Sequence, residues 1–431
     1  MSSINTGKTA FRPMAICCAL FFILGFITWA NGTLIPFLKI ACNLETDLQA
    51  FFVTFASYIA YFFLALPSSW ILKKIGFKNG LVVSLIILGL GSLIFIPAAD
   101  QRSYGLFLTG IFIQGSGMAL LQTAVNPYLS IIGPIDSAAQ RISIAGVFNK
   151  TAGIIVPIVF GSLFLKDAEK VTEKLNATTD LVAKNVILDD LLQRVHTPYI
   201  ALAIIFVLFA IFIKFTYLPE VDVDAEEEVS QDDTVIHSSQ KTSVTQFPHL
   251  FLGAFAIFFC VAVEVMAGDI IGVYGRELNV NTFFVTYATA FTLGCMLLGY
   301  AIGIITIPRF VTQQMALRIC TLVGILFTLI SVFTTGTTSF IFVALLGVAN
   351  SLMWPAIFPL GIKGLGRFTK TGSAIMIMGI AGGAIWPLVY GYLKDNLGID
   401  FQHAFLYAMV PAYLYILYFA TAGHKVGQKR A

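Results

Sequence analysis

The sequence predicts an all-α membrane protein in which twelve transmembrane helices form two six-helix, pseudo-repeated bundles. Three observations predict this fold class. Apolar residues make up 58% of the 431 residues and charged residues only 11%, whereas roughly a quarter of the residues in a soluble domain are charged. Apolar runs of about 20 residues, the length that crosses a bilayer, recur along the chain. Gly and Pro also recur at a nearly constant offset in the two halves.

The apolar runs are bounded by charged or turn residues, which places the ends of each span. The first run, residues 14–37, is too long for the apolar core of a signal peptide and is not followed by a cleavage site, so we expect it to be the first transmembrane helix. The expected spans are 13–38, 49–72, 79–98, 104–130, 141–165, 198–218, 248–275, 282–307, 314–335, 338–361, 371–393 and 402–422.

Lys and Arg follow the positive-inside rule, by which short loops rich in these residues lie in the cytoplasm. With the N-terminus inside, the cytoplasmic segments hold Lys8, Arg12, Lys73, Lys74, Lys78, Arg141, Arg309, Arg318, Lys363, Arg367, Lys370, Lys425, Lys429 and Arg430. The short outer loops hold only Lys39, Arg102, Arg276 and Lys394. Both termini are therefore expected in the cytoplasm, and the number of spans is expected to be even.

Two long polar segments separate spans. Residues 166–197 are mixed in charge and are expected to form an outer loop. Residues 219–247 contain an acidic run and lie at the midpoint of the chain, so we interpret them as a solvated cytoplasmic linker. The expected domains are an N-terminal bundle of residues 1–218 and a C-terminal bundle of residues 248–431.

The two halves share a pattern of Gly and Pro. Gly153, Pro157 and Gly161 recur 230 residues later as Gly383, Pro387 and Gly391. Both segments run from the end of one span, through a basic loop, into the next span. Parallel repeats of this kind are typical of major facilitator transporters.

The sequence resembles the fucose–proton symporter family of the major facilitator superfamily, and within it the bacterial glucose/galactose branch. The resemblance covers nearly the whole chain and implies the major facilitator fold. The stretches that carry it are Trp29-Ala-Asn-Gly-Thr-Leu-Ile-Pro36, Gln122-Thr-Ala-Val-Asn-Pro-Tyr128, Phe148-Asn-Lys-Thr-Ala-Gly153, Val263-Glu-Val-Met-Ala-Gly-Asp269 and Leu360-Gly-Ile-Lys-Gly-Leu-Gly366.

Two departures from the family pattern concern ion coupling. The fucose–proton symporter has an Asp after the Asn of the first span, where this chain has Gly32, and a Glu in the fourth span, where this chain has Gln122. Those carboxylates are linked to proton coupling and sugar binding in that transporter, so its coupling cannot be transferred to this chain. The Glu-Val pair at Glu264 resembles the glucose/galactose branch, which is associated with sodium- or proton-linked hexose uptake.

Intramembrane amides are candidate sugar contacts, because sugar hydroxyls donate and accept hydrogen bonds and polar side chains in a bilayer face the protein interior or water. Gln122 and Asn126 share one face of the fourth span, and Asn31 lies late in the first span. Asn149 aligns with an asparagine that the family places near the substrate. The alternative for each amide is a hydrogen bond between helices, and Asn126, which precedes a proline, is also suited to steady a helix end.

Lys150, Glu264 and Asp269 are the full charges expected well inside spans. An unpaired charge near mid-bilayer costs several kcal/mol, so we expect Lys150 to pair with Glu264 or Asp269 of the other half. The two acids are five residues apart, about 140° around a helix, and need different partners unless the helix breaks near Gly268. The pair could change its protonation during transport or serve as a static salt bridge, and the sequence leaves both open.

Trp354 and Trp386 in the tenth and eleventh spans could stack on a pyranose ring or belong to interfacial belts. No metal site is expected, because the six cysteines lack metal-ligand spacing and most lie in apolar runs, where they act as small apolar residues.

The expected function is import of a glucose- or galactose-like hexose by alternating access, coupled to sodium or protons. No catalytic cluster is found, so no enzyme activity is expected, and no cofactor is expected beyond the co-transported ion. The expected partners are the sugar and the lipid bilayer, since a net charge of +3 is too small to favour nucleic acid. We expect a monomer in the bacterial inner membrane. An uncoupled sugar facilitator and an exporter of another small metabolite remain alternatives.

Overall fold

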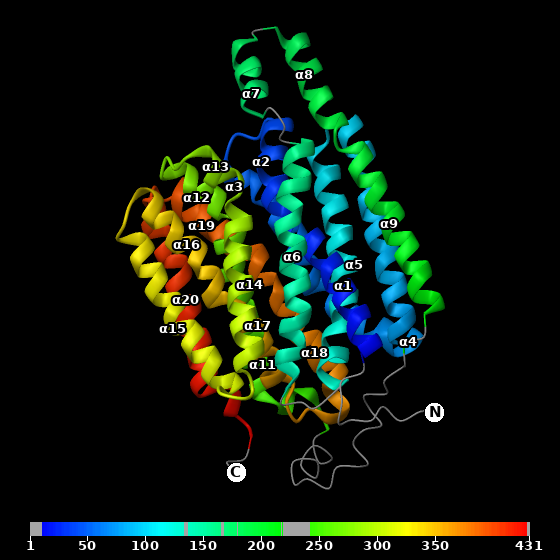
Figure 1. Ribbon diagram of the computed structural model, residues 1–431. Coiled ribbons are helices and arrows are strands. Elements are labelled where there is room, and N and C mark those ends of the chain that lie inside the picture. The colour runs from blue at the N-terminus through cyan, green and yellow to red at the C-terminus, as the bar shows by residue number, and fades with distance from the viewer. Residues whose placement is uncertain are drawn as a thin grey trace.

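The computed structural model describes residues 11–132, 137–164, 168–178, 180–216, 218 and 242–428, and these residues are almost entirely helical (Figure 1). Eleven helical segments among them are long and apolar enough to cross a membrane. One of them, Leu48–Asp100, has 53 residues, more than twice the length of about 20 residues that a span requires. It contains α4 (Phe52–Asp100), in which Gly76 has φ 78° and ψ 168°. Only glycine adopts such a backbone readily. Gly76 therefore divides α4 into two spans, and the predicted twelve-span helical fold is confirmed.

The helices of the first half follow the expected spans closely. They are α1 (Phe11–Trp29), α2 (Asn31–Ala41), α3 (Asp47–Ala50), α4, α5 (Tyr104–Ile131), α6 (Ala138–Phe164), α7 (Ala168–Ala177), α8 (Leu181–Gln193) and α9 (His196–Phe215).

The second half contains shorter pieces. They are η3 (Val244–Gln246), α11 (Pro248–Gly268), α12 (Ile271–Glu277), α13 (Thr282–Thr286), α14 (Ala288–Thr306), α15 (Gln313–Val332), α16 (Gly336–Ser351), α17 (Met353–Ile362), η4 (Gly366–Phe368), α18 (Thr369–Met378), η5 (Gly379–Ala381), α19 (Gly382–Asp395), α20 (Phe401–Thr421) and η6 (Gly423–Lys425).

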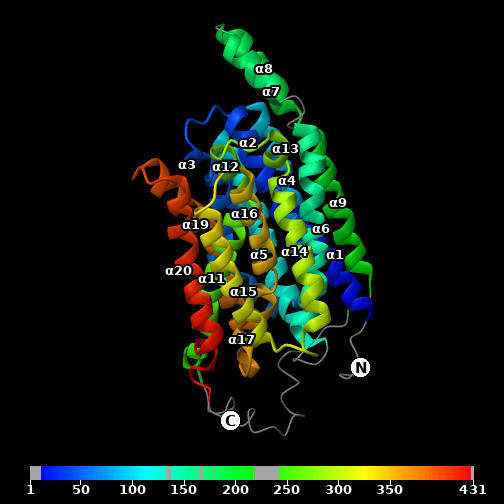
Figure 2. The same ribbon diagram turned by 60° about the vertical axis from the view of Figure 1, so that its left-hand side comes forward.

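The two halves lie side by side, with α15, α16 and α20 on one side and α1, α6 and α9 on the other (Figures 1 and 2). They meet where α6 packs on α14 and α17, and where α4 packs on α18 and α19. The exact domain boundaries remain a prediction, and the expected linker, residues 219–247, lies outside the described residues as far as position 241.

Residues 166–197 differ from the sequence prediction of an outer loop. Helices α7 and α8 occupy much of this segment and project from the end of the molecule opposite the beginning of α1 (Figure 1). Asp180 caps α8 by accepting a hydrogen bond from the backbone N–H of Val182 at 3.1 Å, and Arg102 donates to Asp189 at 2.8 Å. The mixed charges that suggested a loop are instead the polar faces of short helices outside the apolar bundle.

Several of the expected continuous spans are interrupted. The first is divided between α1 and α2 at Ala30, the seventh between α11 and α12, and the tenth between α16 and α17 at Leu352. The eleventh passes through the 3₁₀ turn η5. The linking residues keep right-handed helical dihedral angles, such as φ −62° and ψ −27° at Ala30, so each break is a local irregularity in a helix and not an unwound segment.

Candidate functional site

A cavity of about 80 Å³ lies between the two halves. Its polar and aromatic lining comes from both halves and includes Thr28, Tyr58, Tyr61, Gln122, Asn149, Lys150, Glu264, Tyr300 and Trp354. Pockets that hold drug-sized ligands are typically about 300–1,000 Å³. A ligand of that size therefore requires the halves to separate further than they do in this conformation.

Gln122 reaches the cavity from α5. Its Nε2 donates to the hydroxyl of Tyr61 at 3.0 Å. One helical turn later, Asn126 is fully buried and its Nδ2 donates to the backbone oxygen of Gln122 at 3.1 Å. The side chains of Gln122 and Asn126 do share a face, but only Gln122 lines the cavity. Asn126 instead forms a hydrogen bond within α5.

Asn149 of α6 lines the cavity and also holds α1. Its Oδ1 accepts from the indole N–H of Trp29 at 3.1 Å, and its Nδ2 donates to the backbone oxygen of Phe21 at 3.2 Å. The helices approach closely here, because a Cβ atom at Gly25 would lie 2.0 Å from the backbone oxygen of Asn149. Asn31 begins α2, and its side chain lies outside the described part of the structure.

The three intramembrane charges gather beside the cavity. Lys150 of α6 forms an ion pair with Glu264 of α11, and its Nζ lies 4.3 Å from the ring centre of Trp29. The Lys150 and Glu264 side chains are 6% and 14% exposed. Asp269 directly follows α11, which ends at Gly268. The helix thus breaks where the sequence allowed it, and the structure brings Lys150 to Glu264 rather than to Asp269.

The two tryptophans have different surroundings. Trp354 of α17 lines the cavity and stacks on Phe358, with ring centroids 5.9 Å apart. Trp386 of α19 instead donates its indole N–H to the backbone oxygen of Ala408 at 2.7 Å and packs edge-on against Phe258 and Phe259. The structure does not bring Trp386 to the cavity.

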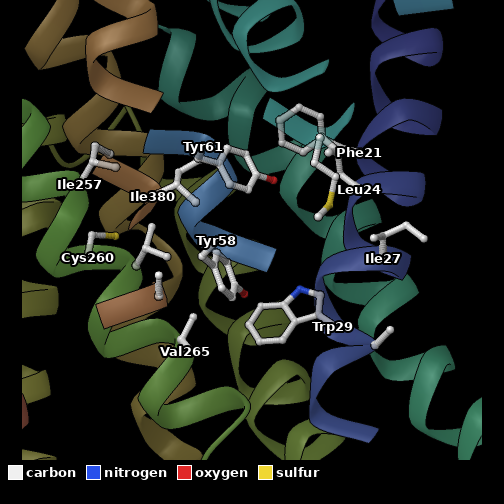
Figure 3. Packing of buried hydrophobic residues seen from close by; sticks show 14 of the residues in the cluster. Phe21, Leu24, Ile27, Trp29, Tyr58, Tyr61, Ile257, Cys260, Val265 and Ile380 are labelled. Carbon is white, nitrogen blue, oxygen red and sulfur yellow. The ribbon is translucent and has the colours of Figure 1, made fainter. Parts of the chain in front are cut away.

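Three cavity tyrosines were missed by the sequence analysis. Tyr58 and Tyr61 of α4 lie between α1 residues such as Phe21 and Trp29 and the α11 residues (Figure 3), and Tyr300 comes from α14. Buried tyrosines usually find a partner for the hydroxyl. The available signal was their place within spans 49–72 and 282–307 rather than at the interfacial ends where tyrosine is common.

Comparison with known proteins identifies the family. The family model of the Major Facilitator Superfamily matches residues 17–389. The chain belongs to the Major Facilitator Superfamily. It is therefore a multi-pass membrane transporter and not an enzyme, which confirms both predictions.

Superfamily members with described substrates are similar over nearly the whole chain. A glucose/galactose transporter of Brucella abortus biovar 1 (strain 9-941) is 35% identical over 94% of this chain and 92% of its own. The L-fucose-proton symporter of Escherichia coli (strain K12) is 32% identical over 90% of this chain and 87% of its own. A crystal structure of the transporter FucP in the outward conformation superposes with a TM-score of 0.76 at 28% identity, covering 96% of this chain and 99% of that one. The resemblance to this branch of the superfamily is thus confirmed.

Proposed function

We propose that this transporter imports a glucose- or galactose-like hexose by alternating access, coupled to sodium or protons. Support comes from the substrates in the names of its relatives and from the chemistry of the cavity. The observation that carries the proposal is that Gln122, Asn149 and Trp354 come from both halves to one cavity.

The cavity lining suits a sugar. Pyranose hydroxyls both donate and accept hydrogen bonds, and the amides of Gln122 and Asn149 can do the same. Tyr61 supplies a hydroxyl beside Gln122. Trp354 supplies an aromatic face against which the apolar face of a pyranose can stack. Its indole ring is already oriented by Phe358.

Alternating access requires contacts between the halves on both sides of the cavity to open in turn. At one end, Gln140 of α6 donates to the backbone oxygen of Ile304 of α14 at 2.9 Å. At the other end, a Cβ atom at Gly391 of α19 would lie 3.2 Å from the ring of Phe51. We place the Gln140 end and both termini in the cytoplasm of a bacterial cell, by the distribution of Lys and Arg, and the protein in its inner membrane as a monomer.

An uncoupled sugar facilitator is the second candidate. The amide of Gln122 at the cavity does not gain or lose a proton at physiological pH, so the position of the family's carboxylate cannot couple transport to a proton here. Facilitation predicts equilibration of sugar without accumulation, whereas coupled import predicts accumulation against a gradient.

The test is uptake of labelled glucose, galactose and fucose into proteoliposomes that contain the purified protein, with sodium and pH gradients imposed separately. Accumulation driven by one gradient supports coupled import and identifies the ion. Counterflow without accumulation supports the facilitator. Absence of both uptake and counterflow of any hexose, with a folded protein, would overturn the sugar proposal.

A further inference from the structure

Asp269 is a buried carboxylate without a hydrogen-bond partner. Its residue is 4% exposed, and neither Oδ1 nor Oδ2 has a partner among the described residues. The residue lies where α11 ends, beside the candidate cavity rather than in its lining. A buried carboxylate that accepts no hydrogen bond is exceptional, because buried polar groups are nearly always paired.

The donors around Asp269 are committed elsewhere. Thr289 of α14 donates to the backbone oxygen of Gly268, and Thr292 donates to that of Ala267, both at 2.8 Å. The ring of Trp29 packs on the preceding residue, since a Cβ atom at Gly268 would lie 2.4 Å from its Cζ3. The described residues around the carboxylate therefore donate no hydrogen bonds that could replace those it would make with water.

The charges around Asp269 do not balance. The titratable groups that face it are Glu264 of α11, Lys150 of α6 and Tyr58 of α4. Lys150 is the cation of this set, and it is bound to Glu264. An ionised Asp269 would thus be a buried negative charge without its own counter-ion, next to a second carboxylate. Burial of such a charge is strongly unfavourable, and the neutral acid is the form that the site can hold.

We propose that Asp269 is the proton-carrying group of this transporter. The inference rests on the proposed function and deepens it by naming the proton as the coupling ion. A proton from the outer solution adds to the carboxylate and gives a neutral acid that can be buried when the halves close. When the inner side opens and water reaches Asp269, the acid releases its proton to water.

The surroundings fit a proton better than a sodium ion. Lys150 adds a positive charge that repels a metal cation. The same charge acts favourably on the ionised Asp269.

The first experiment compares wild type, Asp269→Asn and the control Glu277→Gln in proteoliposomes. Glu277 is an acid outside the bundle that pairs with Lys394 at 3.0 Å. One pH unit can drive about tenfold accumulation per coupled proton. We expect about this accumulation for wild type and the control. For Asp269→Asn we expect a ratio of about one, with hexose counterflow retained and no sugar-evoked proton uptake by a trapped pH dye.

The outcomes separate the two proposals. If Asp269→Asn still accumulates sugar with the pH gradient, or loses counterflow while remaining folded, Asp269 is not the proton carrier. If wild type shows counterflow without sugar-evoked proton uptake, the inference is overturned and sugar transport stands. If wild type exchanges no hexose, the proposed function falls and the inference with it.

A second variant tests the inference if Asp269→Asn does not insert into the membrane as a folded protein. Asp269→Glu keeps the titratable group but moves it within the apolar site. We expect it to retain sugar-evoked proton uptake with a shifted pH profile. An unshifted profile would overturn the assignment of the proton to this position.

Discussion

Lys150 of α6 and Glu264 of α11 form an ion pair that joins the two halves of the transporter beside the candidate cavity. Both side chains are largely shielded from solvent. A charge left without its partner in such a place is far less favourable than the pair itself, and the loss of one partner of a buried pair typically costs about 3–5 kcal/mol. The pair is therefore both a structural link and a feature that the transport cycle has to accommodate.

We predict that Lys150→Met and Glu264→Gln each lower the thermal stability of the purified transporter, and that the double variant is more stable than Lys150→Met alone. The reason is that Lys150→Met leaves the Glu264 carboxylate unpaired, whereas the double variant leaves no charge at this position. Unfolding temperatures in detergent measure the effect, with Glu277→Gln as the exposed control. Independent, additive effects of the two substitutions would contradict an energetic link between them.

The transport phenotype of Glu264→Gln tests the role of the pair. Uptake that fails while counterflow survives would indicate a coupling role. If uptake and counterflow are both unchanged, Glu264 takes no part in coupling. We expect both to fall together, because the unpaired Lys150 disturbs the cavity directly and the proton is assigned to Asp269.

Gln122→Leu is expected to weaken hexose binding. A lost hydrogen bond contributes about 0.5–1.5 kcal/mol, which corresponds to an increase in KM of up to roughly tenfold. The matched control is Gln114→Leu on the same helix. Gln114 is buried, donates to Ser92 at 2.9 Å and does not line the cavity. Measured KM values for uptake should rise for Gln122→Leu and stay near wild type for Gln114→Leu. Equal effects would remove Gln122 from the binding site.

Much of this fold could be predicted from the sequence because the bilayer imposes simple rules. Span length and the cost of charge in hydrocarbon were sufficient to locate the spans and to single out Gln122, Lys150 and Glu264, whereas Asn149 was singled out by the resemblance to the fucose–proton symporter family. These rules could not show that Trp354 lines the cavity and Trp386 does not, since both lie in apolar spans. The orientation of each indole depends on tertiary neighbours, such as Ala408 for Trp386, and these are not encoded in local patterns.

The helix breaks were equally inaccessible to hydropathy. A hydropathy profile averages over some 20 residues, and a break changes the backbone of only a few. The interruption after Gly268 matters most, because it leaves Asp269 at a helix end. The sequence could say only that Glu264 and Asp269 would need different partners unless the helix broke near Gly268.

Arg141 is predicted to stabilise the end of α5. This arginine is buried, and its guanidinium donates to the backbone oxygens of Leu129 and Ser130, each at 2.8 Å. Such carbonyls lack partners within a helix, and a positive charge at a helix C-terminus is also favourable. Arg141→Leu should lower the unfolding temperature. Each lost hydrogen bond from the charged guanidinium should reduce the free energy of unfolding by about 1.5–3 kcal/mol at most.

Arg141→Lys should recover only part of this stability, because a lysine cannot present two fixed donors to two carbonyls. The control is Arg309→Gln, which removes an exposed arginine in another loop. Similar unfolding temperatures for Arg141→Leu and Arg309→Gln would show that Arg141 acts only as a surface charge.

Asp400, at the start of α20, is predicted to make a pH-dependent contribution to the stability of the fold. Partial burial tends to raise the pKa of its carboxyl, but hydrogen bonds from the side chain and backbone of His403 and from the backbone of Gln402 outweigh this and hold the pKa below its ordinary value of 3.8. A lowered folded-state pKa stabilises the fold above the unfolded-state pKa and loses this effect as the pH falls through the folded-state pKa. Asp400→Ala should therefore be less stable than wild type at pH 7, and the difference should shrink below about pH 4. A difference in unfolding temperature that is constant from pH 7 to pH 3 would contradict the role of the carboxylate.

The last prediction concerns the contact between Gly383 of α19 and Tyr58 of α4, which crosses between the halves. A Cβ atom at Gly383 would lie 3.0 Å from Cγ of Tyr58 and 3.0 Å from Cγ2 of Val265. Gly383→Val should push Tyr58 away, and overpacking of this kind typically costs about 1–3 kcal/mol. Because Tyr58 also lines the cavity, hexose uptake should fall together with the unfolding temperature. The control is Gly161→Val, at a helical glycine of α6 with no atom within 4 Å of the added Cβ. A double variant that adds Tyr58→Leu should recover stability relative to Gly383→Val, since the smaller side chain leaves room for the valine. If it does not, the steric contact between these two positions does not limit the approach of the halves.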